Sequence, residues 1–520
     1  MNINILDCTL RDGGYINDWK FSDNQIVNII SALKNANIDI IELGYLNDKK
    51  GQKSNSTLFD SVQTFTKLLN RLQIDKQAVV MINLGDFDIK KLPLQKDTLI
   101  DGIRLAFHKK DLQKAIKETK YIISLGYKVY FQPMVTKNYK DIEFLSLVDK
   151  ANSLGVYSFY VVDSFGSMTL EEFQRYMILA NNNLNENILL GYHSHNNMQL
   201  AFSNAINMCN TNLNRNIIVD ASIYGVGRGA GNLNTELITD YLNNTFNSNY
   251  KTLPLLEIID NFLSFLMSKN PWGFSPAQYL SASFDCHPNY ATYLINKNTN
   301  NISSIKNLLE QIPLDKKLSF DQTYIKELYI KEILSKKLTT VGNLTFKDKS
   351  ILLVASGKSV NTNEQLYIDK AEDNQYIKIA LNHMPKFECD YYFFTNQKRY
   401  DEFKTKLNKT KLIITNNITT NNIPTYVLDF SKLVIINDDY IITSSAILFI
   451  NYLILNKIET VDIIGLDGYK IGINNYSYDE NAIINNEKLL KEENHKISIA
   501  LNILLNKINI NILTPSIFKD

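Results

Sequence analysis

The chain of 520 residues is predicted to fold as an α/β protein, with an N-terminal (β/α)8 barrel and a second α/β domain behind it. Three observations predict the barrel. Short apolar runs of β type alternate with amphipathic, helix-compatible segments from Met1 to about Gly227. Polar residues gather at the carboxyl ends of these runs, where barrel loops build a site, and a Gly-rich string follows the last run. The strands are expected at Ile3–Cys8, Asp39–Gly44, Ala78–Leu84, Leu99–Phe107, Val129–Val135, Ser158–Val162, Ile188–His193 and Ile217–Ile223.

The seventh run ends in the string GYHSHNN, Gly191 to Asn197, which holds two of the six histidines of the chain. Because successive side chains of a strand point to opposite faces, His193 and His195 project to the same side. Two imidazoles that converge in this way can bind a metal ion. The alternative interpretation is a pair of hydrogen-bonded histidines at a strand end.

The first run leads into the string LDCTLRDGGYINDW, Leu6 to Trp19. Asp12 would add an oxygen ligand to the two imidazoles, and such a set leaves positions open for a substrate, as metal catalysis requires. Arg11 offers a permanent positive charge for an oxyanion. Without its context, an Arg-Asp-Gly-Gly string is typical of a surface turn. Closure of a barrel brings the first strand beside the eighth, near the seventh, so we expect Asp12 to meet the histidines.

Polar residues that follow other strands are expected at the same rim. Arg104, Gln132 and Ser164 are predicted to bind substrate, because they follow the fourth, fifth and sixth strands. The Gly-rich string IYGVGRGAGNLNTE, Ile223 to Glu236, allows close approach of the backbone to a ligand. It suits a phosphate-binding loop or a simple turn, and the amide oxygen of Asn232 is a suitable fourth metal ligand.

The strings LRDGGY, HSHNN and GAGNLNTE, in this order, resemble those of the metal-dependent DRE-TIM metallolyases. This superfamily includes 4-hydroxy-2-oxovalerate aldolase, 3-hydroxy-3-methylglutaryl-CoA lyase and the isopropylmalate synthases. The resemblance covers about residues 1–335, and it includes the string WGFSPAQYLSASFDCHPNYATYL from Trp272 to Leu294. It implies a divalent ion, Mn²⁺ or Mg²⁺ with Co²⁺ or Zn²⁺ as alternatives, and an enolate stabilised by Arg11. The implied metal ligands are Asp12, His193 and His195, with Asn232 as a common additional ligand.

Differences within these strings indicate the subclass. Synthases of the superfamily typically show HxHND, whereas this chain reads HSHNN, and its GRGAGN is close to the GAGAGN-like loop of the aldolases. The resemblance therefore favours a metal-dependent aldolase or lyase that makes or breaks a carbon–carbon bond next to a pyruvate-like 2-oxo acid, with an aldehyde as the second reactant. Two alternatives stay open: acyl-CoA lyase or synthase activity, and a non-catalytic barrel that supports a glycosyltransferase-like C-terminal domain.

One residue departs from the aldolase pattern. Where the pyruvate aldolases place a catalytic histidine shortly after the Arg-Asp-Gly string, this chain has Tyr15. An unperturbed tyrosine has a pKa of about 10 and is a poor base near neutrality. The candidates for the proton-transferring group are therefore Tyr15, His108, His287, Tyr290 and water held by the metal.

Composition argues against several classes of function. Apolar residues make up 45% of the chain and the formal net charge is +1, so there is no electrostatic case for nucleic acid or an anionic membrane. The four cysteines show no paired metal spacing and no disulfide framework, which fits a reducing cytosol. No run reaches the ~20 apolar residues of a membrane span, and Met1 leads straight into a strand without a secretory signal. We expect a cytoplasmic homo-oligomer, since barrels of the resembled superfamily often associate.

Three parts are expected: a metal-dependent barrel at residues 1–240, a helical extension at 241–340 and a second domain at 348–520. The boundary is placed near residues 335–348, where a polar connector follows a charged helical stretch. Alternating apolar runs predict a small, doubly wound, Rossmann-like sheet in the second domain. Its first apolar run, Ile351–Val360, is expected to form a strand and then a Gly-rich turn. Further strands are expected at Ile377–Leu381, Tyr391–Phe394, Lys411–Thr415, Thr425–Leu428, Thr460–Ile464 and Ile508–Leu513, with a buried helix at Ser444–Lys457.

Four strings of the second domain, LLVASGKSV, DYYFFTN, TSSAILFINYLI and VDIIGLDGY, faintly resemble the bacterial sialyltransferase-like fold and related sugar-processing domains. The resemblance implies a nucleotide sugar as ligand, with His495 as counterpart of the catalytic histidine. It points to Gly357, Ser359, Asn382, Asn396 and Asp467 as the binding residues. Each of these side chains equally suits a turn or a helix cap. The pairing of the two domains suggests a setting in surface-polysaccharide sugar biosynthesis.

Overall fold

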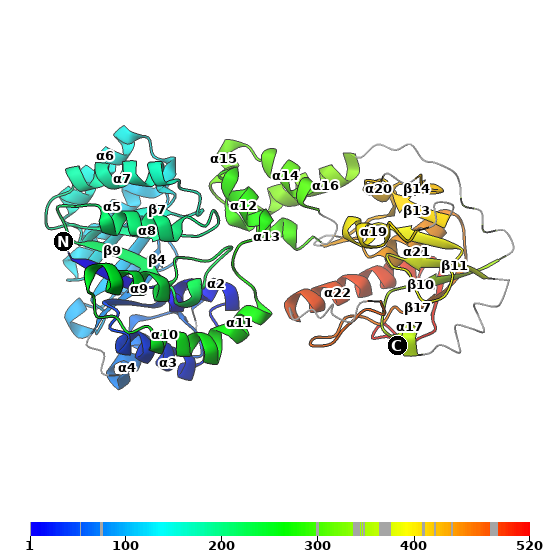
Figure 1. The fold of residues 1–520 in the computed structure, drawn as a ribbon, viewed down its shortest axis with the longest axis horizontal. Coiled ribbons are helices and arrows are strands. Elements are labelled where there is room, and N and C mark those ends of the chain that lie inside the picture. The colour runs from blue at the N-terminus through cyan, green and yellow to red at the C-terminus, as the bar shows by residue number, and fades with distance from the viewer. Residues whose placement is uncertain are drawn as a thin grey trace. The chain divides into compact units, whose positions relative to one another are not determined.

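In the computed structural model the chain forms two compact units (Figure 1). The first unit comprises Met1–Thr292 and Ile312–Phe320, and the second comprises Tyr293–Gln311 and Asp321–Asp520. The structure describes residues 2–51, 54–72, 76–297, 301–335, 344, 346, 349–362, 376–407, 411–420, 423–437, 440–478 and 487–519.

Eight parallel strands form a closed barrel in the first unit. They follow the order β1-β9-β8-β7-β6-β5-β4-β2, and the pairing of β1 with β2 closes the cylinder. A short strand, β3 (Leu58–Phe59), pairs in parallel with the last two residues of β2. All eight predicted strands are confirmed, with ends shifted by a few residues at most. They are β1 (Ile3–Asp7), β2 (Ile40–Leu46), β4 (Gln77–Asn83), β5 (Gly102–Phe107), β6 (Lys128–Pro133), β7 (Ser158–Asp163), β8 (Leu189–Ser194) and β9 (Ile217–Ala221).

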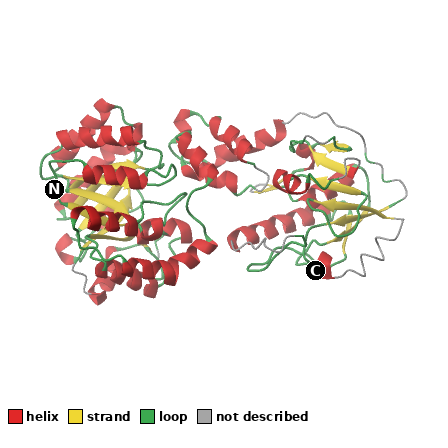
Figure 2. Ribbon diagram, in the orientation of Figure 1, coloured by secondary structure: helices red, strands yellow, loops and turns green. Residues whose placement is uncertain are grey.

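Helices connect the strands and surround the barrel (Figure 2). In the first long helix, α3, the buried residues Ile26, Ile29, Ile30 and Leu33 recur at a spacing of three and four, which places them on one face. Ser22 begins this helix by accepting a hydrogen bond from Gln25 N–H, in a capping box. The long helices between the strands are α3 (Asp23–Asn35), α4 (Val62–Leu72), α5 (Leu112–Ser124), α6 (Asp141–Leu154), α7 (Leu170–Asn183) and α8 (Ala201–Asn210), with α9 (Thr235–Phe246) after β9.

The region that follows the barrel is helical, as predicted for the extension. The division between the two compact units falls inside it, between Thr292 and Tyr293, and the predicted connector near 335–348 lies mostly outside the described residues. The predicted boundaries therefore stay a prediction. The helices are α10 (Leu253–Ile258), a π-helical turn (Ile259–Leu263), α11 (Ser264–Lys269), α12 (Pro276–Ser283), α13 (Pro288–Ile295), α14 (Ile302–Glu310), α15 (Leu314–Lys317) and α16 (Gln322–Ser335).

The second unit contains a sheet of seven parallel strands in the order β14-β13-β12-β11-β10-β17-β18. The strand order reverses beside β10, because later strands continue on both of its sides. All seven predicted strands are confirmed: β10 (Ser350–Val354), β11 (Tyr376–Leu381), β12 (Tyr391–Phe394), β13 (Leu412–Thr415), β14 (Tyr426–Leu428), β17 (Thr460–Ile464) and β18 (Asn509–Ile512).

The predicted buried helix of this unit is also confirmed, as α21 (Ser445–Leu455). The other described helices are α17 (Ser359–Thr362), α19 (Gln397–Phe403), α20 (Phe430–Leu433) and α22 (Glu487–Leu504). An antiparallel pair, β15 (Ile435–Asn437) with β16 (Tyr440–Ile442), was not expected. Among the described helices, none combines the length and the apolarity that crossing a membrane requires.

The Asp7 carboxylate joins the end of β1 to the start of α9. Its Oδ2 accepts a hydrogen bond from Thr235 Oγ1 at 2.6 Å, and its Oδ1 accepts one from Thr9 N–H at 2.9 Å. Burial raises the pKa of this carboxyl group to about 6, because desolvation outweighs the hydrogen bonds. Since the folded pKa is above the unfolded value, the stability that this group contributes at low pH is lost as the pH rises through about 6.

We therefore expect the Asp7→Asn variant to become more stable relative to the natural protein as the pH rises from 5 to 8. Between pH 5 and 8 the stability difference between the variant and the natural protein is expected to change by about 1.5 kcal/mol, because the carboxyl group loses its proton in the folded state over this range and asparagine cannot ionise. Urea unfolding at both pH values measures it. Asp149→Asn, at an exposed position of α6, is the matched control. A stability difference that is the same at both pH values would contradict the prediction.

Candidate metal centre and active site

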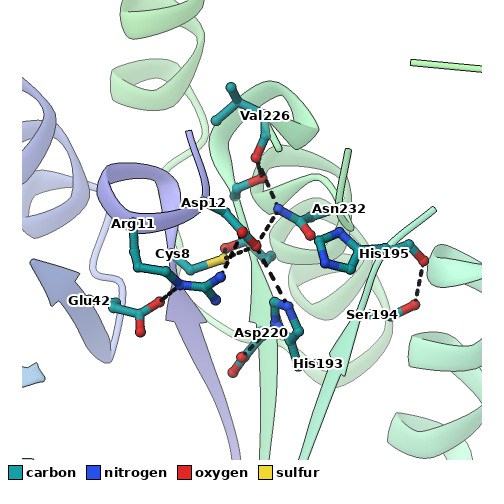
Figure 3. A network of polar contacts seen from close by, with 12 residues as sticks. Cys8, Arg11, Asp12, Glu42, His193, Ser194, His195, Asp220, Val226 and Asn232 are labelled. Carbon is teal, nitrogen blue, oxygen red and sulfur yellow. Dashed lines mark hydrogen bonds and ion pairs between the residues drawn. The ribbon is translucent and has the colours of Figure 1, made fainter. Parts of the chain in front are cut away.

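Asp12 reaches the mouth of the barrel because a tight helical turn follows β1. Residues Thr9–Asp12 form α1, which is fully buried, and Asp12 N–H donates to Cys8 O at 2.8 Å. Gly13 then separates α1 from α2 (Gly14–Asn17), and a Cβ atom at Gly13 would lie only 2.5 Å from Thr9 O. The backbone is thus held where the Asp12 carboxylate points toward the carboxyl ends of β8 and β9 (Figure 3).

The two histidines lie at the same place, His193 at the end of β8 and His195 directly after it. His193 Nδ1 lies 2.9 Å from Asp220 Oδ2, and its Nε2 lies 3.6 Å from Asp12 Oδ2 (Figure 3). A carboxylate behind an imidazole fixes the ring so that the other nitrogen faces a metal. The ring of His195 lies 5.5 Å from that of His193, between centroids. Burial lowers the pKa of His195 to about 3, although Asp12 opposes this, so the ring is neutral near pH 7.

Asn232 completes the cluster from the loop after β9. Its Nδ2 donates to Asp12 Oδ2 at 2.9 Å and to Val226 O at 3.0 Å, and it pairs with His195 in an isolated β-bridge. The residue before Asn232 must be a glycine, because Gly231 has φ +80° and a Cβ atom there would collide with Gly225 O.

A chain of ion pairs surrounds Asp12 and His193. Arg11 Nη1 lies 2.6 Å from Asp12 Oδ1, and Arg11 Nε lies 2.9 Å from Glu42 Oε2. Arg104 Nη1 lies 2.7 Å from the same Glu42 oxygen, and Arg104 also pairs with Asp220. Burial opposes ionisation of Asp12, but Arg11 and the two histidines hold its pKa well below the usual range.

These residues fit a divalent cation. Ligand atoms of Cys8, Asp12 and His193 lie within 4.8 Å of one another. His195 Nδ1 and Asn232 Oδ1 are buried without hydrogen-bond partners, although such atoms are normally paired. The buried ion-pair network has three carboxylates and two guanidinium groups, which leaves one negative charge for a cation to balance. Burial raises the pKa of the Cys8 thiol, so Cys8 stays neutral and is a poor ligand.

Comparison with known proteins shows which family the barrel resembles. A family model described as HMGL-like matches residues 102–260, which include both histidines and Asp220. The comparison confirms the resemblance of the barrel to HMGL-like domains of the DRE-TIM aldolase type. The N-terminal domain of a candidate aldolase from Bacteroides vulgatus has a solved structure that matches with a TM-score of 0.50 and 29% identity. The match covers 58% of this chain and 99% of that one.

Curated relatives of the HMGL-like barrel are named for different reactions. 4-Hydroxy-2-oxovalerate aldolase of Geobacillus genomosp. 3 is 26% identical over 242 residues, which cover 46% of this chain and 70% of the relative. Oxaloacetate decarboxylase of Mycobacterium tuberculosis is 22% identical over 274 residues, which cover 52% of this chain and 79% of the relative. The likeness therefore supports carbon–carbon lyase chemistry as a class and does not select one reaction.

The HMGL-like barrel has a cavity of about 190 Å³ at this cluster. Most of the predicted site residues line it, including Gln132 and Ser164, and Ser164 Oγ accepts a hydrogen bond from Val135 N–H at 2.8 Å. The sequence-based interpretation did not single out Arg228, an isolated cation among glycines, which also lines the cavity. Polar residues that line it are Arg11, Asp12, Tyr15, Tyr45, Asn83, His108, Gln132, Ser164, His193, His195, Arg228 and His287.

Arg104 is not among the residues that line the cavity. It is fully buried inside the barrel, where it pairs with Glu42 and Asp220. With its amide oxygen turned toward Arg104, Gln132 accepts from Arg104 Nε at 2.8 Å, which leaves the amide NH₂ group of Gln132 for the cavity. The position of Arg104 therefore does not support the predicted contact with substrate. Its ion pairs with Glu42 and Asp220 indicate that it orders the ion-pair network below the cavity.

The candidates for proton transfer also separate by position. Tyr290 is fully buried outside the cavity lining, and its hydroxyl donates to Lys316 O at 2.9 Å and to Ser319 O at 3.1 Å, so its position does not support a catalytic role. Desolvation is the largest cause of the lowered pKa values of His108 and His287. Tyr15 is 41% exposed, and desolvation of its hydroxyl raises its pKa although Arg228 opposes this. Near pH 7 both imidazoles are therefore neutral and Tyr15 is protonated.

In the second unit, the predicted binding residues hold loops at the carboxyl edge of the sheet. Ser359 N–H donates to Asp467 Oδ2 at 2.7 Å, and Gly357 N–H donates to Gly465 O at 2.8 Å. Asn382 Oδ1 accepts from Thr395 N–H at 2.9 Å. Asn396 caps α19 by accepting from Arg399 N–H, and His495 is exposed on α22 beside Tyr440. These contacts are those of turns and caps, and a role in ligand binding stays a prediction.

Proposed function

We propose that the HMGL-like barrel is a divalent-metal-dependent aldolase that makes or breaks the carbon–carbon bond next to a pyruvate-like 2-oxo acid. The observation that carries this proposal is the convergence of Asp12, His193, His195 and Asn232 in a buried cluster with excess negative charge. These four residues would hold the ion, which when bound acts as a Lewis acid on the 2-oxo group. A setting in surface-polysaccharide sugar biosynthesis, in a cytoplasmic homo-oligomer, is part of the proposal.

Arg11 is placed to stabilise the enolate. Its Nε and Nη1 are occupied by Glu42 and Asp12, but its Nη2 is buried without a partner, and the side chain lines the cavity. A fixed N–H donor of this kind gains strength as negative charge develops on the substrate oxygen. Its two carboxylate contacts keep the guanidinium in one orientation, so no reorganisation is needed during the reaction.

For cleavage, a base removes the proton of the substrate hydroxyl, the carbon–carbon bond breaks toward the 2-oxo group, and the aldehyde leaves. We assign the base to His108, because it is a neutral imidazole of the cavity. His287 Nδ1 accepts from Asn289 N–H at 3.2 Å, which leaves its Nε2 as a hydrogen-bond donor. Tyr15 is protonated and is placed to donate a proton to the enolate carbon.

The experiment that tests the proposal uses the full chain after removal of metal. With Mn²⁺, Mg²⁺, Co²⁺ or Zn²⁺ restored in separate samples, we expect release of pyruvate from 4-hydroxy-2-oxo acids, measured through lactate dehydrogenase. Turnover of acyl-CoA thioesters in place of pyruvate release would establish the alternative lyase or synthase activity. A chain that retains none of the metals and neither releases nor consumes a 2-oxo acid would indicate a scaffold.

For the second unit we propose binding of a phosphate-bearing ligand, with a nucleotide sugar as the predicted form. A cavity of about 730 Å³ is lined by residues that follow β10, β11 and β17, at the edge where such sheets bind ligands. Lys358, Lys386 and Lys406 line it, and its described lining includes no acidic residue. Tyr476 and Tyr478 line it as well, with the Arg399 guanidinium carbon 4.8 and 5.3 Å from their ring centroids.

We expect the full chain to bind pyrophosphate and uridine diphosphate, and the Lys386→Gln/Lys406→Gln double variant to bind them about tenfold more weakly, because two charged donors are removed. Titration calorimetry at two salt concentrations measures this, and the affinity should fall with added salt. Lys432→Gln, at a largely exposed lysine of α20, is the matched control. Equal affinity of the double variant and the control would contradict the proposal.

A further inference from the structure

Arg228 is a cation of the barrel cavity that the proposed chemistry does not use. It lies between Gly227 and Gly229 in the loop after β9, and its side chain lines the cavity that contains Asp12 and both histidines. The guanidinium carbon lies 5.2 Å from the centroid of the Tyr15 ring. Within the described residues its buried Nε has no hydrogen-bond partner, and the guanidinium group forms no ion pair.

The loop that carries Arg228 is fixed on both sides. Ala230 N–H donates to Asn197 Oδ1 at 2.9 Å, and Gly231 N–H donates to Arg228 O at 3.1 Å. Gly229 has φ +68°, and a Cβ there would lie 2.7 Å from Asn197 Oδ1. The backbone therefore presents the Arg228 side chain to the cavity from one position, as a binding residue requires.

The other two arginines near the cluster differ from Arg228 in their partners. Arg11 and Arg104 each pair with two carboxylates, so their charges are balanced inside the protein. The network keeps one negative charge, and a divalent cation together with the carboxylate of one 2-oxo acid would bring the total to zero. The positive charge of Arg228 is then not balanced by any of these groups. Because an unpaired charge in a poorly solvated place is costly, a second anion is expected beside it.

We infer that Arg228 binds an anionic group, a carboxylate or a phosphate, carried by the aldehyde that reacts with the 2-oxo acid. The inference rests on the proposed aldolase function and adds the class of the second substrate. The ring of Tyr15 contacts the guanidinium group through its face, which leaves the N–H groups free for a bidentate contact with an oxyanion. The cavity of about 190 Å³ is small, which favours an aldehyde with few carbon atoms.

The test measures kcat/KM for condensation with pyruvate in the Mn²⁺-loaded full chain. Three aldehydes are compared: neutral propionaldehyde, succinic semialdehyde with a carboxylate, and glycolaldehyde phosphate. We expect one anionic aldehyde to be preferred over propionaldehyde by at least about tenfold, and the better of the two identifies the group. In Arg228→Gln this preference should fall by about 10- to 100-fold, the usual loss for a hydrogen bond to a charged group.

Arg228→Lys keeps the charge and is expected to restore part of the preference. Arg175→Gln, which removes a surface guanidinium of α7, is the control and should keep the preference of the natural protein. If propionaldehyde is used as well as both anionic aldehydes, or Arg228→Gln lowers all three values equally, the inference is wrong and the aldolase proposal stands. If none of the aldehydes reacts, the aldolase proposal itself is wrong.

Discussion

Replacing Asp12 by alanine is expected to abolish metal retention and turnover together. The carboxylate of Asp12 lies 3.6 Å from His193 Nε2, 2.9 Å from Asn232 Nδ2 and 2.6 Å from Arg11 Nη1. Its removal takes away the hard oxygen ligand and leaves Arg11 facing the histidines. We expect kcat to fall by at least about a thousandfold, because Lewis-acid stabilisation is worth several kcal/mol.

Metal content of the purified variants, measured by elemental analysis, separates loss of the ion from loss of a catalytic group. His195→Ala is expected to lose the ion as well, since its ring is neutral and buried beside Asn232. Cys8→Ala is the matched control, because its thiol donates to Ala221 O at 3.2 Å and is not deprotonated. Retention of metal and normal turnover in Asp12→Ala or His195→Ala would contradict the assignment of the site.

Replacing Arg104 by methionine is expected to lower the free energy of unfolding by about 3–5 kcal/mol, the usual cost of removing one partner of a buried ion pair. Methionine fills much of the volume, but Glu42 and Asp220 would both lose the guanidinium group that neutralises them. Asp220 also accepts from Tyr160 OH at 3.0 Å and holds His193, so the metal ligand should lose its fixed orientation.

Urea unfolding and substrate kinetics together decide the role of Arg104. A structural role predicts a large loss of stability and weaker metal binding, whereas the substrate contact expected from the sequence predicts a raised KM with little change in stability. Arg175→Gln, which removes a half-exposed ion pair with Asp141, should leave the unfolding free energy nearly unchanged. A loss of less than about 1 kcal/mol in Arg104→Met would contradict the structural role.

The barrel strands could be predicted because each is a short, mostly apolar run whose residues are largely buried. In β2 every residue from Ile40 to Leu46 is buried, so the run shows no alternation and stands out from the amphipathic helices. The meeting of Asp12 with His193 was also predictable, since barrel closure places β1 beside β9 and next to β8. The short pair β15–β16 was not, because three-residue strands with partly exposed side chains carry no clear pattern.

The sequence did not indicate how deep in the barrel a strand residue lies. Arg104 is the third residue of β5, so it points into the interior below the rim, whereas Gln132, near the end of β6, reaches the cavity. The role of Arg228 was hidden for a different reason. One arginine among glycines has no periodicity, and only the folded loop shows that it lies over Tyr15.

The pairing of β1 with β9, which closes the barrel, determines when the candidate metal site can form during folding. Asp12 belongs to the first turn of the chain, whereas His193, Asp220 and Asn232 come after most of the barrel has been synthesised, and only the pairing of β1 with β9 brings them together. A nascent or partly assembled barrel consequently has no complete coordination sphere. Capture of an ion at this site would then report that β9 has docked, and the proposed chemistry would begin only in molecules that have finished folding.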